Sequence, residues 1–277
     1  MRPLPRSPFL GLICVLLPAI ISVVGASFAL EPGANLNGAA GLRVPILVYH
    51  RFGPTVADAM TVRTEDFAAQ LKYLHERGYH VVPLREVVAW MRGGTPPPRD
   101  SIAITADDGH KTVFTDMLPL VERYRVPVTL FIYPSAISNA SYAMTWEELR
   151  RLKATGLFDI QSHTFWHPNF KVEKRRLSPA QYEEFVRMQL SRSRQVLDTR
   201  LGLNVDMLAW PFGIYDDELI RMARAAGYVA GFTLKRASVS AGDDVMALPR
   251  YLMTDEMRGS AFAKFIARAT APASVRN

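Results

Sequence analysis

Cysteine is almost absent from this sequence of 277 residues, and histidine is scarce. The single cysteine, Cys14, excludes a disulfide within the chain and a metal site built from several thiolates. The chain has six histidines, and none of them follows His167. Carboxylates and a few imidazoles are therefore the side chains that could hold a metal ion.

Strong charge of one sign is also missing. Hydrophobic residues make up 49% of the chain and charged residues 21%, which leaves room for one large domain or two small ones. The formal net charge is +7, and the basic residues are dispersed apart from Lys171–Arg176, which we expect to be a solvated loop. This balance argues against nucleic acid as a partner and suits an anionic envelope surface or polymer better.

The first residues have the pattern of a secretory signal. Two arginines precede an apolar run from Phe9 to Val24, and small residues follow it. We expect residues 1–29 to be a signal peptide cleaved after Ala26 or Ala29, or else an uncleaved anchor, because the stretch from Phe9 to Leu30 is long enough to span a bilayer. Either alternative predicts an exported protein, periplasmic, secreted or associated with the cell envelope. Contact with a membrane is expected only through this segment, and only if it is not cleaved.

Short apolar runs alternate with amphipathic stretches along the rest of the chain. Residues 30–43 are predicted to be a linker, and a single domain is predicted at residues 44–277. The expected strands cover residues 44–50, 79–84, 101–105, 128–133, 157–163, 206–210, 228–234 and 246–252. Helices are expected between them, two of which open with capping boxes at Thr145 and Ser178. Seven or eight strands in this alternation favour a (β/α) barrel, with a doubly wound open sheet as the alternative.

Polar residues fall at the carboxyl ends of several predicted strands. His50, Asp107, Asp108, His163 and the turn 210–213 all occupy such positions. In a (β/α) barrel this rim carries the chemistry. The coincidence at four strands therefore predicts a functional site there.

A metal site is the first chemistry that these residues suggest. His163 and His167 stand four residues apart, and Pro168 favours a rigid turn rather than a helix. Two histidines alone could equally be a structural or surface pair. Asp108 is the available third ligand, and two imidazoles with one carboxylate are typical of a catalytic Zn²⁺ or similar divalent site.

The second aspartate would then have a separate task. Asp107 could remove a proton from a water whose pKa the metal lowers, while Asp108 neutralises the ion. Gly109 permits the turn that directs both carboxylates inward. On these three residues alone, a polar pair that caps the following helix is the favoured explanation of the pattern.

Three motifs together resemble those of one family. TADDG (105–109), HTFWH (163–167) and WPFG (210–213) have the order and separations of the polysaccharide deacetylase family, the NodB-homology proteins. The opening VPILVYHRF (44–52) is similar to the branch of exported poly-beta-1,6-N-acetylglucosamine N-deacetylases of biofilm systems. The resemblance covers nearly all of residues 44–252. It implies a distorted, incomplete (β/α) barrel of seven to eight strands, which forms the NodB-like catalytic domain.

The resemblance also implies roles for individual residues. Asp107 matches the general base, and Asp108, His163 and His167 match the metal ligands, with Zn²⁺ expected and Co²⁺ or Ni²⁺ as alternatives. Phe212 stands where the family commonly has tyrosine, and its backbone N–H would help to hold the oxyanion. Because that role uses only the main chain, the change of side chain leaves it intact.

The sequence departs from the family at other positions. Ala106 replaces a usual phenylalanine, and Ala209 stands where many members have an arginine that orients the base. The histidine that supplies the catalytic acid near the C-terminus of many members is also missing. His50 is therefore the candidate general acid, as the biofilm branch suggests, and Arg250 is the candidate replacement for the orienting arginine.

The implied reaction is metal-dependent removal of N-acetyl groups from a polysaccharide. The expected substrate is a β-linked N-acetylglucosamine polymer, with poly-N-acetylglucosamine of biofilms favoured over chitin oligosaccharides, peptidoglycan or an acetyl ester. Trp166, Trp210 and Phe212 could form an apolar floor for a sugar ring, although such aromatics are more often packing. Separate proteins for synthesis or export of the polysaccharide are the expected partners. A catalytically silent glycan-binding module is the alternative from another class.

Overall fold

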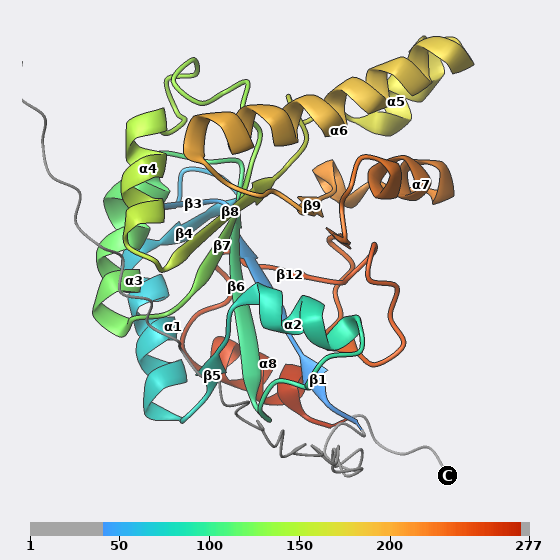
Figure 1. Cartoon of the computed structure of the whole chain (residues 1–277). Coiled ribbons are helices and arrows are strands. Elements are labelled where there is room, and N and C mark those ends of the chain that lie inside the picture. Colours follow the sequence, from blue (N-terminus) through green and yellow to red (C-terminus); the bar gives the residue numbers. More distant parts are fainter. Residues whose placement is uncertain (1–40, 273–277) are drawn as a thin grey trace, which may run out of the picture. The chain divides into compact units, whose positions relative to one another are not determined.

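A curled parallel sheet forms the centre of the structure, a computed structural model that describes residues 41–272 (Figure 1). Its strands follow the order β12-β2-β6-β7-β8-β9-β10, and every neighbouring pair is parallel. The bounds are β2 (Ile46–Tyr49), β6 (Ser101–Asp107), β7 (Val128–Ile132), β8 (Phe158–Ser162), β9 (Met207–Ala209), β10 (Ala230–Phe232) and β12 (Tyr251–Leu252).

The two edges of this sheet are linked through the segment that leads into β12. The N–H of Gly231 in β10 donates to the Val245 carbonyl at 2.9 Å, and the N–H of Leu248 donates back to Gly231 at 2.8 Å. An isolated parallel bridge joins Phe232 to Leu248. Since β12 lies at the opposite edge, the sheet is curled into an incomplete barrel. The predicted distorted (β/α) barrel in one domain is therefore confirmed, and the doubly wound open sheet is not observed.

Short strands complete the sheet structure. β1 (Arg43–Val44) pairs with β11 (Val239–Ser240), β3 (Arg51–Gly53) pairs with β4 (Thr61–Arg63), and β5 (His80–Val81) pairs with the start of β6. The first predicted strand is thus divided in two. Pro45 lies at the division, and because proline has no N–H it cannot continue a ladder. The predicted linker also ends earlier than expected, because Leu42 is buried and Arg43 belongs to β1.

Helices surround the sheet and connect its strands (Figure 1). They are α1 (Thr64–Glu76), α2 (Leu84–Met91), the π-helix η2 (Val113–Met117), α3 (Leu118–Tyr124), α4 (Trp146–Ala154), α5 (Phe170–Arg176), α6 (Pro179–Leu201), the 3-10 turn η3 (Pro211–Gly213), α7 (Asp217–Ala225) and α8 (Gly259–Thr270). Both predicted capping boxes form, at Thr145 with Glu148 and at Ser178 with Gln181.

The predicted loop at Lys171–Arg176 is wrong. These residues belong to the helix α5, which lies beside α6 (Figure 1). Asn169 caps the helix by accepting a hydrogen bond from the N–H of Val172 at 3.1 Å. Lys174 then fixes it to α7 through ion pairs with Asp216 and Glu218, at 2.9 and 2.7 Å. Tertiary contacts therefore stabilise a helix that is too short to be stable alone.

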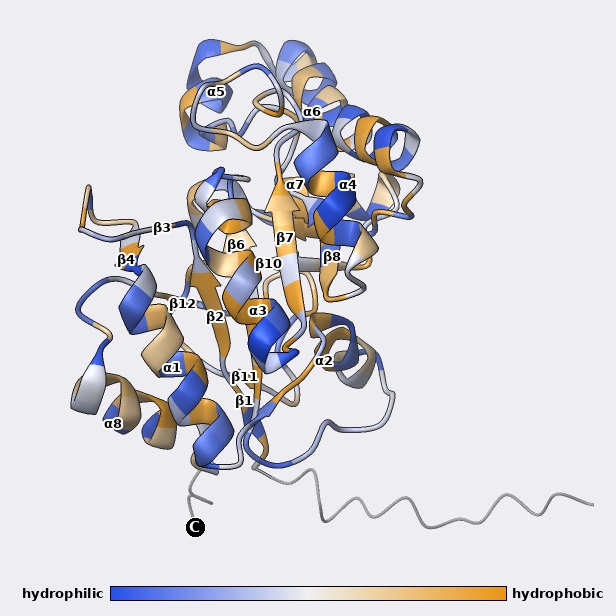
Figure 2. Ribbon diagram, turned by 90° about the vertical axis from the view of Figure 1, so that its left-hand side faces the viewer, coloured by the Kyte–Doolittle hydropathy of each residue, from blue (hydrophilic) through white to orange (hydrophobic). Residues whose placement is uncertain are grey.

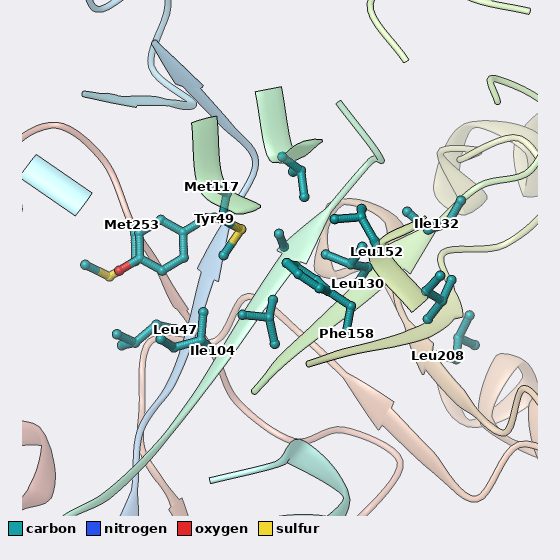
Figure 3. Packing of buried hydrophobic residues seen from close by; sticks show 14 of the residues in the cluster. Leu47, Tyr49, Ile104, Met117, Leu130, Ile132, Leu152, Phe158, Leu208 and Met253 are labelled. Carbon is teal, nitrogen blue, oxygen red and sulfur yellow. The ribbon is translucent and has the colours of Figure 1, made fainter. Parts of the chain in front are cut away.

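Apolar residues pack against both faces of the sheet, and its central strands are largely hydrophobic (Figure 2). On the outer face, alternate residues of neighbouring strands, such as Leu47, Ile104 and Leu130, pack with helix residues such as Leu152 (Figure 3). The inner face holds a second cluster of smaller extent, which includes Phe131 and side chains of α2. The alternation directs Asp107, the last residue of β6, toward the inner face and away from the outer core.

The N-terminal segment lies outside the described residues. The expectations for residues 1–29 and for most of the predicted linker concern this undescribed part. Within residues 41–272, none of the helices combines the length and the apolar character needed to cross a bilayer.

Candidate active site

Three predicted metal ligands meet at the carboxyl ends of β6 and β8. Asp108, His163 and His167 each place one ligand atom within 4.8 Å of the others. Asp108 Oδ1 lies 3.6 Å from His163 Nε2 and 3.8 Å from His167 Nε2. The two imidazole rings stand edge to face, with centroids 4.5 Å apart. Strand ends that are distant in sequence thus converge on one small volume.

The tautomer of His163 follows from its surroundings. Its Nδ1 lies 2.8 Å from the carbonyl oxygen of Ala209, which can only accept a hydrogen bond. Nδ1 therefore carries the proton, and the lone pair of Nε2 faces the carboxylates. Burial lowers the pKa of His163 to about 3, so the ring is neutral at neutral pH. This is the form in which histidine binds a metal ion.

The surroundings of Asp108 fit a bound cation. Its Oδ1 is buried, and it has no hydrogen-bond partner among residues 41–272. Burial and the neighbouring Asp107 raise the pKa of Asp108, which shows that nearby side chains do not fully stabilise its charge. A carboxylate and two neutral imidazoles with an unpaired oxygen between them fit a divalent ion.

Backbone conformations with positive φ place these side chains. Asp108, Thr164, His167 and Phe212 have φ values of 71°, 64°, 64° and 56°. Such angles are uncommon outside glycine and are concentrated at functional sites. The turn at Asp108 therefore does not depend on Gly109 alone, although that residue also has a φ of 75°.

Asp107 is held by Arg250. The guanidinium donates from Nη1 to Oδ1 at 2.8 Å and from Nη2 to Oδ2 at 2.7 Å, and both side chains are buried. Arg250 also donates to the carbonyl of Thr233 and to the hydroxyl of Thr105. Burial raises the pKa of Asp107, but the charge and hydrogen bonds of Arg250 outweigh it and lower that pKa to about 2. Asp107 is thus ionised, with Oδ2 3.7 Å from His163 Nε2.

The charges of Asp107 and Asp108 also act on His50. Its side chain is buried, and Nδ1 finds no hydrogen-bond partner within the described part of the chain. Burial lowers the pKa of His50, while the carboxylates of Asp107 and Asp108 oppose that shift. The structure therefore brings the predicted acid, base and ligands to the same rim.

The three aromatic residues predicted to contact a sugar differ in exposure. Trp166 and Phe212 are 50% and 56% exposed, and the Phe212 ring lies 4.6 Å from that of His167. Trp210 is fully buried, and its Nε1 donates to the carbonyl of Met246 at 2.8 Å. The expectation of a sugar-binding role for Trp210 is therefore wrong, because this ring is part of the core.

Gln189 of α6 supports the turn that carries the two histidines, and the sequence motifs do not include it. This fully buried side chain accepts hydrogen bonds through Oε1 from the N–H groups of Phe165 and Trp166, at 3.2 and 3.0 Å. The hydroxyl of Thr164 accepts another from the N–H of His167 at 3.2 Å. The one sign of this role in the sequence is a glutamine on the apolar face of a helix.

Tyr133 is a second residue near the ligands that the sequence motifs did not reveal. It follows directly after β7, and its ring centroid lies 5.4 Å from that of His167. Burial and the hydroxyl of Tyr142 raise the pKa of Tyr133, with Asp108 adding to the shift. The phenol is therefore neutral beside the ligands.

Comparisons with known proteins identify similar sequences. The family model described as polysaccharide deacetylase matches residues 94–231. The chain is 26% identical to the YxkH protein of Bacillus subtilis strain 168 over 224 residues, which cover 81% of this chain and 76% of that protein. It is 25% identical to a poly-beta-1,6-N-acetyl-D-glucosamine N-deacetylase of Staphylococcus aureus strain MRSA252 over 201 residues, covering 71% and 69%.

A solved structure shares the fold. The deacetylase PplD of Streptococcus pyogenes, in complex with acetate, has a TM-score of 0.74 and 21% identity, covering 84% of this chain and 100% of that chain. The stretch matched by the family model contains Asp107, Asp108, His163 and His167, whereas His50 and Arg250 lie outside it. Motifs, fold and relatives lead to one conclusion: the chain belongs to the polysaccharide deacetylase family.

Proposed function

We propose that this protein is a metal-dependent N-deacetylase that removes acetyl groups from a β-linked N-acetylglucosamine polysaccharide, with poly-N-acetylglucosamine as the favoured substrate. The observation that carries the proposal is an Asp108 oxygen that has no hydrogen-bond partner among residues 41–272 and lies close to two imidazole nitrogens, next to an ionised Asp107. Asp108, His163 and His167 would hold the ion, for which Zn²⁺ is the first candidate and Co²⁺ or Ni²⁺ the alternatives. When bound, it would polarise the acetamide carbonyl and lower the pKa of a water.

Asp107 is suited to take the proton of the attacking water. Arg250 keeps the carboxylate ionised and fixes its orientation through two hydrogen bonds. Its Oδ2 lies 3.7 Å from the Nε2 atom of His163, so it borders the space where the ligand atoms converge. Asp107 is therefore the proposed general base, and Arg250 the residue that positions it.

The leaving amine needs a proton, and His50 is the proposed donor. Its Nδ1 is buried without a partner among the residues described; burial lowers the pKa of His50, and the carboxylates of Asp107 and Asp108 oppose that shift. The backbone N–H of Phe212, held by a turn with positive φ, is the proposed donor to the oxyanion of the tetrahedral intermediate. Proton removal and proton delivery are thereby assigned to different groups.

The choice of substrate rests on similarity to a relative. The Staphylococcus aureus protein is named for poly-beta-1,6-N-acetyl-D-glucosamine, and the present chain spans 69% of it. The exposed rings of Trp166 and Phe212 offer apolar surface beside the ligands, as a sugar ring requires. Export is proposed from the signal-like N-terminal residues, and the proposed partners are the proteins that synthesise and export the polysaccharide.

The direct test is an assay of acetate and free-amine release by the purified protein. Oligomers of β-1,6-linked N-acetylglucosamine, chitin oligosaccharides and peptidoglycan fragments form the panel. We expect the β-1,6-linked oligomers to have the highest kcat/KM, with activity lost in chelator and restored by Zn²⁺, Co²⁺ or Ni²⁺. Preference for another glycan would overturn the substrate, and a complete lack of activity with metal bound would favour a glycan-binding module.

A further inference from the structure

Tyr133 occupies a strand end between the two strands that carry the predicted ligands. β7 pairs with β6 on one side and with β8 on the other. Asp107 and Asp108 stand at the end of β6, and His163 directly follows β8. Because the strands are parallel, Tyr133 lies on the same rim as the ligands, in the central position.

The hydroxyl of Tyr133 is paired with a second phenol. Its oxygen lies 2.5 Å from the hydroxyl oxygen of Tyr142, a residue of the loop between β7 and α4. The Tyr133 ring lies against the imidazoles, with centroids 5.4 Å from His167 and 6.5 Å from His163. Tyr142 is 41% exposed, so the pair extends from the ligands to the surface.

The residues that follow Asp108 in the sequence hold Tyr142 in place. Its carbonyl accepts a hydrogen bond from the N–H of Lys111 at 2.8 Å, and its ring stacks on His110 at 6.1 Å with an interplanar angle of 12°. The carbonyl of Gly109 accepts another from the N–H of Met144 at 2.9 Å. The loop that carries Tyr142 is therefore attached to the residues directly after Asp108.

Two phenols provide more hydrogen-bonding capacity than this pair uses. Each hydroxyl has one proton and two lone pairs, and one proton is used between the two oxygens. Among residues 41–272 neither hydroxyl makes another hydrogen bond. One O–H and several lone pairs are therefore directed elsewhere, on a partly exposed surface that borders the ligands. A phenol hydroxyl can both donate and accept a hydrogen bond, so the pair suits the hydroxyl and ether oxygens of a sugar.

We propose that Tyr133 and Tyr142 together form a binding site for hydroxyl or ring oxygens of the sugar that bears the scissile acetamide. The inference rests on the proposed function and adds the residues that orient the sugar. The alternative is a structural role, in which the phenols only support the ring of His167. The Tyr→Phe substitution separates the two, because it removes the hydroxyl and keeps the ring.

The experiment compares Tyr133→Phe, Tyr142→Phe and the double variant with the wild-type protein. Tyr124→Phe is the matched control, because Tyr124 is also partly buried but lies at the end of α3, before β7 begins. Two quantities are measured: the KM and kcat for β-1,6-linked N-acetylglucosamine oligomers, and the Kd for Zn²⁺. We expect each single hydroxyl deletion to raise KM about three- to tenfold, as the loss of a neutral hydrogen bond predicts.

The Kd for Zn²⁺ should stay within about twofold of the wild-type value in all variants, and the double variant should match the stronger single one because the hydroxyls act as a unit. A weaker Zn²⁺ affinity that accounts for the lost activity would overturn the inference in favour of support for His167. An unchanged KM in the double variant would also overturn it while leaving the proposed function intact. If the wild-type protein deacetylated no glycan, the proposed function would fail and this inference with it.

Discussion

The carboxylate of Asp107 and the guanidinium of Arg250 form a two-bond ion pair, although 143 residues separate them in the sequence. Both side chains are buried, so each charge is compensated by the other. The pair explains how a buried carboxylate can have a pKa of about 2 and remain available as a base. Asp107 should therefore be ionised throughout the neutral range.

Loss of the arginine should shift the pH dependence of the reaction. In Arg250→Gln the pKa of Asp107 rises, because burial is no longer opposed, and the base protonates at a higher pH. The acidic limb of kcat/KM should move upward by at least about one pH unit, and stability should fall by about 3–5 kcal/mol. Arg85→Gln removes half-exposed ion pairs with Asp159 and Asp206 elsewhere and should change neither the limb nor, beyond about 1 kcal/mol, the stability. If the acidic limb of kcat/KM stayed at the wild-type pH in Arg250→Gln, Arg250 would not be the group that keeps Asp107 ionised.

His50 should govern the opposite side of the pH profile. A general acid acts in its protonated form, so the rate should fall as the pH rises through the pKa of His50, which burial lowers. In His50→Gln this descending limb should disappear, and kcat should drop about 10²- to 10⁴-fold. The measurement is the pH–rate profile of both proteins with saturating Zn²⁺. If the two profiles have the same shape, another group donates the proton.

Gln189 should affect metal affinity without touching the ion. In Gln189→Leu the N–H groups of Phe165 and Trp166 lose their acceptor, so the turn between the two histidines is less well fixed. The Kd for Zn²⁺ should rise about tenfold. Gln195→Leu, at an exposed position of the same helix, is the control and should leave the Kd unchanged. Equal Kd values for Gln189→Leu and the wild-type protein would show that the turn is rigid without this side chain.

The two tryptophans of the motifs should respond in opposite ways. Trp210→Ala removes a fully buried ring and should cost about 3–5 kcal/mol of stability. Trp166→Ala should change stability by less than about 0.5 kcal/mol and raise the KM for glycan oligomers about three- to tenfold. Urea denaturation and steady-state kinetics measure these effects. A Trp166→Ala variant with an unchanged KM would exclude this ring from sugar binding.

The sequence predicted the barrel and the location of the site because both depend on local patterns. Apolar runs that alternate with amphipathic stretches indicate parallel strands, and the polar motifs directly follow those strands. The strand ends at Asp108 and His163 could therefore be expected to lie close together. The ion pair with Arg250 could only be suggested, because nothing in the local sequence specifies a contact across 143 residues.

Other features depend on tertiary contacts that no local pattern specifies. α5 is a short basic segment whose helix depends on the cap at Asn169 and on ion pairs with α7. Trp210 lies in a motif that borders the site, yet its ring turns into the core. Tyr133 ends a hydrophobic strand, and its aromatic ring gave no sign of a polar contact there. The pairing of its hydroxyl with Tyr142 depends on how the following loop folds back.

The unequal roles of the adjacent aspartates are the centre of this account. The most direct test compares Asp107→Asn with Asp108→Asn by measuring Zn²⁺ affinity and turnover on the same samples. Asp107→Asn should bind Zn²⁺ with nearly wild-type affinity and lose about 10²- to 10⁴-fold in kcat, because only the base is removed. Asp108→Asn should lose more than about a hundredfold in Zn²⁺ affinity, and its turnover with it. Equal loss of metal in both variants, or full turnover in Asp107→Asn, would contradict the assignment of one carboxylate to the ion and the other to the water.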